Sequence, residues 1–450
     1  MRALSVLGLT LVGLLFFIWP IPHTIAARNL LMLASLALLG CLAYKAKLGW
    51  PALYAELKMP ARLGLAFIGW LLVCALVISS ETSWSLGEIA GQWGKGLLAL
   101  GIGVLGGGLA IQGKLFSRNS LLLMVFTALF AHVLYLGASD VVGFLGNGVL
   151  ARRVSGLTEG PDKANYLTNM ALAILAAEVF FRVTFHRRLL PLNNFLLVAA
   201  IGLTGFSSYI EGMRNGMVAV LFLFASIGGL YWLENRQKMK TGLLVGSLAG
   251  LIAVVGIFGY ASFKADQRWQ TLFQTIPVAL DTAHNKAWLD FQKYPLPTLA
   301  DGRPVEVSAY LRAAWFKEGV VALMEHPLGI GFGRNAFGHA IKEKYGEGGG
   351  HSHSGLLDLA IGTGIPGMLL WLGFLLSLLY LAARRYFQHK NPYALILFFL
   401  VTGYSARMVV DSIIRDHMLE QFMFLVGMFG VLMLHEKRTA PEERNGAHAV

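Results

Sequence analysis

Long runs of apolar residues restrict the fold of this chain more than any other feature of its sequence. They form about twelve blocks of roughly 17–25 residues, the length that an α-helix needs to cross a bilayer. An unpaired backbone amide is costly in lipid, so each block is expected to be a helix. The predicted fold class is all-α: a polytopic membrane protein with about 12 transmembrane helices, whose approximate cores are 3–20, 29–44, 63–80, 96–112, 120–138, 166–185, 192–208, 215–233, 241–262, 356–383, 391–406 and 417–434.

The positions of the basic residues decide what the net charge of +12 means. Apolar residues make up 56% of the chain and charged residues only 14%, which excludes an ordinary soluble surface. Clusters of basic residues lie in alternate connections, and the positive-inside rule assigns these to the cytoplasm together with both termini. Nucleic acid is therefore not a predicted partner. The cytoplasmic clusters are Lys45, Lys47, Lys58 and Arg62; Lys114 and Arg118; Arg182, Arg187 and Arg188; Arg236, Lys238 and Lys240; and Arg384, Arg385 and Lys390.

The longest interruption between apolar blocks divides the chain into regions. Its pieces "QTLFQTIPVALDTAHNKAWLDFQKYP" and "PVEVSAYLRAAWFKEGVVALMEHP" have apolar residues at helical spacing, which predicts two amphipathic helices near the membrane face. The glycine-rich "GFLGNG" and "GIGFGRNAFG" predict turns. The first block follows a basic start, so a cleaved secretory signal is an alternative to a retained helix. The predicted regions are transmembrane helices 1–9 over 1–262, a periplasmic loop domain over 263–355, helices 10–12 over 356–435 and a cytoplasmic tail over 436–450.

A group of arginines lies in the loops assigned to the outer side. The guanidinium fork can bind two phosphate oxygens at once, so these residues predict a phosphorylated ligand outside the membrane. Contacts to lipid headgroups or within loops are the alternative for each of them. For Arg214 a functional role is favoured over these alternatives. It lies beside Glu211 at the mouth of a predicted membrane helix, where a charged residue is costly. The outer arginines are Arg152, Arg153, Arg214, Arg268, Arg303, Arg312 and Arg334.

The stretch "HSHSG", residues 351–355, allows four interpretations. A His-x-His pair can chelate zinc, but further ligands are available only from the scattered His326, His339 and Asp358. A serine could cap the next helix with a histidine merely nearby. A nucleophilic serine would lack the usual strand-turn-helix elbow. A neutral imidazole at the membrane boundary can instead act as a general base. The only two cysteines, Cys41 and Cys74, lie inside apolar blocks and predict neither a disulfide framework nor a metal site.

The second histidine begins a pattern that resembles the bacterial O-antigen ligases. His353 and Ser354 are followed after nine residues by Gly364 and, three later, by Gly367, whereas His351 does not keep this register. Upstream, "LRAAWFKEGVVALMEHPLGIGFGRNAFG" is similar to the stretch that precedes the histidine across the O-antigen ligase and polymerase superfamily. The segments "RRVSGLTEGPDKANY" and "GMRNG" are similar to further outer segments of these proteins. The matching residues outside the histidine motif are Arg312, Trp315, Arg153, Gly156, Asn165 and Arg214.

The resemblance implies a GT-C-like membrane glycosyltransferase in the inner membrane of a Gram-negative bacterium. Its donor would be an O-antigen linked to undecaprenyl diphosphate, its acceptor a sugar hydroxyl of lipid A-core, and its surroundings membrane lipids. His353 would be the base of an inverting, metal-independent transfer, and Arg214 and Arg312 would bind the diphosphate. No cofactor is implied. Weaker candidates for binding donor or acceptor are Arg153, Arg268, Trp315 and Asn165, and the supporting residues are Ser354, Asp358, Gly364 and Gly367.

Several assignments stay open at this point. Asp358 could orient the imidazole of His353 or pair with an arginine. The charged cluster "YSARMVVDSIIRDHMLEQ", with Arg407 and Asp411, is interpreted as structural. An O-antigen polymerase and a protein O-oligosaccharyltransferase are the alternatives within the superfamily. A lipid-linked glycan flippase is the alternative of another class, although it should place ionisable residues near mid-membrane, whereas this sequence keeps nearly all of them at helix ends.

Overall fold

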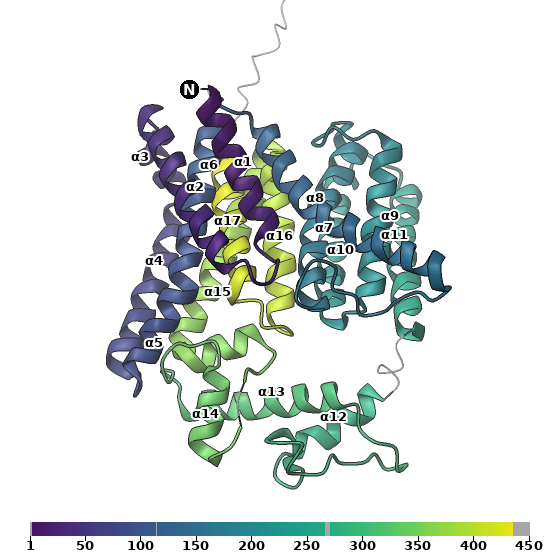
Figure 1. Cartoon of the computed structure of the whole chain (residues 1–450). Helices are drawn as coiled ribbons and strands as arrows, with labels where there is room; N and C mark the ends of the chain where they lie inside the picture. The colour runs from purple at the N-terminus through teal and green to yellow at the C-terminus, as the bar shows by residue number, and fades with distance from the viewer. Residues whose placement is uncertain (1, 114, 266–270, 349, 435–450) are drawn as a thin grey trace, which may run out of the picture.

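The computed structural model describes residues 2–113, 115–265, 271–348 and 350–434. Over these residues the fold is all-helical, apart from one isolated bridge between Thr298 and Pro304. Long helices stand side by side in a bundle, and the segment between α11 and α15 covers one end of it (Figure 1). The helices of the bundle are α1 (Arg2–Ile18), α2 (Ile25–Lys45), α3 (Trp50–Glu56), α4 (Lys58–Val73), α5 (Thr82–Glu88), α6 (Lys95–Gln112), α7 (Arg118–Asn147), α8 (Pro161–Phe185), α9 (Asn194–Glu211), α10 (Arg214–Asn235), α11 (Thr241–Ala265), α15 (Gly355–His389), α16 (Pro392–Met408) and α17 (Asp416–Leu432).

Each predicted apolar block coincides with one of these helices. By length and composition, nine helical stretches of the described residues are long and apolar enough to cross a membrane. Two of these stretches include π-helical turns, which continue α4 over Cys74–Ile78 and join α5 to α6 over Ile89–Gly94. The helices α1, α16 and α17 have 17 residues each and pack into the same bundle. The chain is thus a multi-pass helical membrane protein.

The tightest helix pair of the bundle joins α6 to α17. A Cβ atom on Gly103 would lie 2.1 Å from the carbonyl oxygen of Phe424, and one on Gly427 would lie 2.5 Å from that of Leu100. Small residues allow two membrane helices to approach in this way and gain packing contacts along their length. The glycine-rich sequence of α6 therefore explains why α17, though short, is buried along almost its whole length.

The segment between α11 and α15 has its own small core. Its helices are α12 (Leu272–Leu280), α13 (Val307–Glu325) and α14 (Ala336–Tyr345), and α13 runs across the end of the bundle (Figure 1). Trp288, Tyr310 and Phe337 are buried in this core together with Ile361 from α15. The apolar contact with α15 fixes the segment to the bundle.

Four local predictions can be compared with the structure. The helix predicted in the second piece is confirmed as α13, but a single helix through "QTLFQTIPVALDTAHNKAWLDFQKYP" is wrong: α12 ends at Leu280, and turns follow. The reason is local, because Asp281 and Asn285 bond nearby backbone and side-chain groups in place of a continued helix. "GFLGNG" lies almost entirely in α7, so a turn there is wrong, and α14 begins inside "GIGFGRNAFG".

Candidate functional site

One cavity of about 330 Å³ brings together the three residues predicted to be catalytic, Arg214, Arg312 and His353. It lies where the first turn of α10 meets α12, α13, the turn before α15 and the end of α16. Apolar side chains from α10, α12 and α13 form much of the wall. The lining residues are Arg214, Asn215, Val218, Leu272, Ile276, Ala309, Arg312, Ala313, Phe316, Ser352, His353, Ser354, Val409 and Val410.

His353 lies on the cavity wall with its ring stacked on Trp315, at 5.5 Å between centroids and 15° between planes. Burial, reinforced by the positive charge of Arg312, lowers the pKa of His353 to about 4. The imidazole is therefore neutral at neutral pH and can accept a proton. Its neighbour His351 lies 4.2 Å away between ring centroids and does not line the cavity. Burial, followed by the charge of Arg415, lowers the pKa of His351 to about 3.

The turn that carries His353 is held by Asp358. The backbone N–H of Ser352 donates to Asp358 Oδ1 (2.9 Å), and Ser412 Oγ donates to Asp358 Oδ2 (3.0 Å). His353 itself has a φ of 59°, a left-handed conformation that needs such support. Ser354 caps α15, because its Oγ accepts from the N–H of Leu357 (3.3 Å). Asp358 was expected either to orient the imidazole of His353 or to pair with an arginine. Its hydrogen bonds show instead that it holds the backbone around the imidazole.

The glycines of the histidine motif interrupt α15. Gly364 has a φ of 67°, and a Cβ atom there would lie 2.3 Å from the carbonyl carbon of Leu328. The N–H of Ile365 donates to Pro327 O (2.8 Å), while Ile330 N–H donates to Ile361 O (3.1 Å). The loop that follows α13 is thereby hydrogen-bonded to the break in α15. The motif thus places α13, with Arg312, at a fixed position relative to His353.

Gly367 serves a second contact near the same break. A Cβ atom there would lie 2.9 Å from Trp70 Cδ1, and the Trp70 Nε1–H donates to the carbonyl of Thr363 (2.6 Å). The carbonyl groups freed by the kink are therefore used by α4 as well as by the loop. The first turns of α15 are anchored on two sides.

The two cavity arginines are held by different partners. Arg214 Nη2 lies 3.1 Å from Glu306 Oε2, and the same carboxylate oxygen caps α13 by accepting from the N–H of Ala309 (2.7 Å). Arg312 Nη1 donates to Asn215 Oδ1 (2.6 Å). Burial, with the nearby charge of Arg214, lowers the pKa of Arg312. Two half-buried guanidinium groups on one cavity wall form a site suited to an anion with several oxygens.

Of the residues predicted to bind donor or acceptor less strongly, Trp315, Arg153 and Asn165 do not line the cavity. Trp315 supports the His353 ring, and its Nε1–H donates to Trp288 O (2.9 Å). Arg153 is exposed with a φ of 60°, and its N–H donates to Ile210 O (2.7 Å). Asn165 is fully buried away from the cavity wall. Arg268 lies outside the described residues.

Asn165 belongs to a closed polar cluster inside the bundle. Its Oδ1 accepts from Arg407 Nη1 (2.9 Å), and its Nδ2 donates to Glu211 Oε2 (2.6 Å). Arg407, only 1% exposed, also pairs with Asp411 (Nε to Oδ2, 2.9 Å), and its Nη2 donates to Asp162 O (2.8 Å). The contacts agree with a structural role for Arg407.

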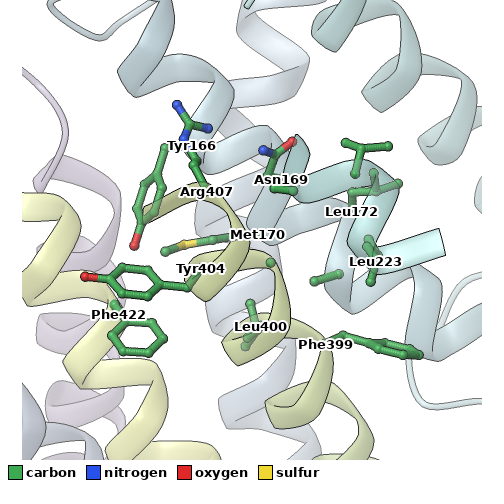
Figure 2. Close-up of a pocket in the computed structure, with 14 residues that line it drawn as sticks. Tyr166, Asn169, Met170, Leu172, Leu223, Phe399, Leu400, Tyr404, Arg407 and Phe422 are labelled. Atoms are coloured by element: carbon green, nitrogen blue, oxygen red, sulfur yellow. The ribbon is translucent and has the colours of Figure 1, made fainter. Parts of the chain in front are cut away.

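A second cavity lies next to this cluster and has a different character. Arg407, Tyr166 and Asn169 lie at one end of it, and Tyr404 stacks on Phe422 below them at 3.6 Å between ring centroids (Figure 2). Its volume of about 30 Å³ is room for one or two water molecules and excludes a sugar or a diphosphate.

Two residues of the site were missed in the sequence. Asn215 directly follows Arg214 in "GMRNG", and Glu306 precedes α13. Position could have drawn attention to Asn215, because it lies in the first turn of the helix that begins with Arg214. Nothing in the sequence pairs Glu306 with Arg214, which is 92 residues away. In the described parts of the chain, no three His, Cys, Asp or Glu side chains are grouped closely enough to hold a metal ion.

The fold and the cavity define a class: a multi-pass helical membrane protein with two arginines and a neutral histidine in one site at the end of its bundle. Residues 198–372 match the family described as O-antigen ligase, which confirms the similarity to the O-antigen ligase and polymerase superfamily. The match runs from α9 into α15 and includes Arg214, Arg312 and His353, whereas Arg153 and Asn165 lie outside it. No curated protein matches the sequence. The family's enzymes are membrane glycosyltransferases, which agrees with a site for proton transfer and anion binding.

Proposed function

We propose that this protein is an O-antigen ligase of the Gram-negative inner membrane. It transfers a glycan from undecaprenyl diphosphate to a sugar hydroxyl of lipid A-core, with inversion and without a metal ion. Twelve helices cross the membrane in a GT-C-like arrangement, and the segment between α11 and α15 is periplasmic. The observation that carries the proposal is the convergence of Arg214, Arg312 and His353 on one cavity.

His353 is the general base of the proposed reaction. As the acceptor hydroxyl attacks the anomeric carbon, its proton passes to the neutral imidazole, a new C–O bond forms, and the bond to the diphosphate oxygen breaks. The lipid diphosphate leaves with the electron pair. A lowered pKa keeps His353 ready to accept the proton, and a bound diphosphate counters the charge of Arg312, which raises the basicity of the imidazole when the donor is present.

Arg214 and Arg312 bind the leaving diphosphate. Glycosidases need an acid to protonate a poor leaving group, whereas a diphosphate leaves as a stable anion whose growing charge the two guanidinium groups stabilise. The apolar wall formed by Val218, Leu272 and Phe316 suits the first isoprenoid units of the donor. Phosphate-binding groups and a lipid-binding wall thus lie in one cavity.

The test is to express the chain in Gram-negative cells that lack their own ligase and to examine lipopolysaccharide on gels. Long-chain lipopolysaccharide is expected to return with the wild-type chain and with His351→Ala, but not with His353→Ala, since a general base contributes about 10²–10⁴-fold to rate. Immunoblots check that the three proteins accumulate equally. Complementation of polymerase-deficient cells instead would identify a polymerase. Loss of activity in His351→Ala alone would overturn the assignment of the base.

A purified system tests the metal-independent chemistry. The solubilised chain, given a lipid-diphosphate glycan and lipid A-core, is expected to transfer at an unchanged rate in excess chelator. A strict requirement for a divalent cation would contradict the assignment of charge stabilisation to Arg214 and Arg312.

A further inference from the structure

Asn215 has a fixed orientation in the cavity and an unused hydrogen-bond donor. It is the second residue of α10 and only 8% exposed. Its Oδ1 accepts from Arg312 Nη1 at 2.6 Å. Because a guanidinium can only donate, the amide oxygen must face Arg312, and the orientation of the amide is not ambiguous. The Nδ2 atom is buried and finds no acceptor among the described residues, although the side chain lines the cavity.

A second asparagine of the molecule accepts from an arginine and also has an acceptor for its Nδ2. Asn165 also accepts from an arginine, Arg407, and its Nδ2 donates to a carboxyl oxygen of Glu211 (2.6 Å). In the cavity, no carboxyl group of the described residues stands opposite Nδ2 of Asn215. A buried donor without an acceptor destabilises a protein, so its presence on a cavity wall indicates a ligand with an acceptor oxygen.

We propose that Asn215 binds the diphosphate of the donor directly. Its Oδ1 holds Arg312 in place, and its Nδ2 donates a hydrogen bond to a phosphate oxygen. An anion is favoured over a sugar hydroxyl because Arg214 and Arg312 flank the amide and because α10, a helix of 22 residues, begins here with its positive end. This inference rests on the proposed function for the identity of the donor.

Asn215→Asp separates the two bonds of the amide. Aspartate has nearly the same shape and still offers an oxygen to Arg312, but it replaces the Nδ2 donor by an oxygen that repels phosphate. The KM for the lipid-diphosphate donor is expected to rise about tenfold or more, the size of a lost hydrogen bond to a charged group, with a smaller change in kcat. If Asn215 only positions Arg312, the aspartate variant keeps the wild-type KM, and the inference is wrong.

Two further variants complete the design. Asn193→Asp makes the same charge change at the exposed N-cap of α9, away from the cavity, and should leave the KM unchanged. Should Asn215→Asp fail to fold, Asn215→Ser and Asn215→Ala replace it, because serine keeps a donor and alanine does not. A lower KM for serine supports the inference, whereas equal values overturn it.

A binding measurement separates this inference from the proposed function. Undecaprenyl diphosphate without a glycan is added to the solubilised full chain, and the rise in Tm is recorded for the wild type and the variants. A rise that Asn215→Asp abolishes supports the inference even if no glycan is transferred, in which case the proposed function fails alone. Glycan transfer by the wild type with equal rises in all variants would sink the inference and leave the proposed function standing.

Discussion

Two arginine–asparagine pairs in this protein have the same hydrogen bond and opposite surroundings. Arg407 donates to Asn165 inside the bundle, and Arg312 donates to Asn215 at the cavity. Inside the bundle every partner is a group of the protein: Asp411 and a backbone carbonyl bind the arginine, and Glu211 accepts from the amide. At the cavity the arginine is half-buried, and the amide donor has no acceptor among the described residues.

The difference between the pairs separates structure from function. A closed polar cluster in a helix bundle satisfies all its members and specifies how the helices pack. The open pair of the same residue types leaves a buried donor without an acceptor among the described residues, in a side chain that lines a cavity. Burial of an arginine therefore says little about its role. The role becomes clear only when the hydrogen bonds of the asparagine that binds it are also known.

The two pairs are also neighbours in the fold. Gly216, the residue after Asn215, is where α10 meets the closed pair: a Cβ atom there would lie 1.7 Å from Asn165 Oδ1. The buried Asn165 thus supports the first turn of the helix that presents Arg214 and Asn215. Asn165 does not line the cavity and packs instead against the helix that does.

The largest expected effect is that of removing either arginine, with opposite consequences. Arg407→Ala leaves Asp411 and Asn165 buried without their partner, and should cost about 3–5 kcal/mol of stability. The side chain of Arg312 lines the cavity. Arg312→Ala should therefore leave the Tm within a few degrees of the wild type, while transfer falls about 10²–10³-fold. Thermal unfolding in detergent and a transfer assay measure the two. A stable, active Arg407→Ala protein would remove the distinction between the pairs.

The geometry of the cavity arginines is tested by lysine. Arg214→Lys keeps the charge and can keep the ion pair with Glu306, so its Tm should stay near the wild-type value. Transfer should fall about 10-fold or more, close to the alanine variant, because lysine cannot bind two phosphate oxygens as a rigid fork. The matched control is Arg303→Lys, at an exposed arginine paired with Asp301, which should be neutral. Full activity of Arg214→Lys would reduce its role to a headgroup contact.

A smaller effect is expected where the two pairs meet. Gly216→Ala forces a methyl group against Asn165, and such overpacking typically costs about 1–3 kcal/mol. Because the displaced turn carries Arg214 and Asn215, transfer should fall as well. The control is Gly229→Ala in the same helix, where a Cβ meets nothing within 4 Å and alanine should be neutral or stabilising. Unchanged stability and transfer in Gly216→Ala would show that the pairs are independent.

The sequence predicts the helices of this fold well because burial in lipid leaves few alternatives for a long apolar block. It also predicts that His353, rather than His351, belongs to the site, since the spacing to Gly364 matches the break that anchors the loop after α13. The early end of α12 could not be predicted from periodicity alone, because the side chains of Asp281 and Asn285 decide it.

Which polar residues meet was beyond the sequence. Arg153, Asn165 and Arg312 all lie in segments that resemble the superfamily, yet of the three only Arg312 reaches the cavity, because α13 crosses the end of the bundle and carries it there. Asn215 and Asn165 are 50 positions apart, and a carboxyl group lies opposite the amide of Asn165, whereas the amide of Asn215 has none among the described residues. Such partners are set by the packing of helices distant in the chain.

The smallest expected effect concerns the acid side of the pH profile, where the open pair acts on the base. A histidine with a pKa lowered to about 4 holds its neutral form above that value and loses it only as the pH falls through it. At pH 5.5 the free enzyme should therefore keep over about nine-tenths of its active base, whereas an ordinary imidazole would keep about one-tenth. Initial rates of transfer are measured between pH 5 and pH 8. The pH dependence of kcat/KM gives the fraction of the free enzyme in which the base is neutral. The apparent pKa from the acid side of the kcat profile should be higher than that from kcat/KM, because the bound diphosphate counters the charge of Arg312. Coincident limbs near pH 6.5 would mean that neither burial nor Arg312 acts on the group that takes the proton, and that the base is not His353.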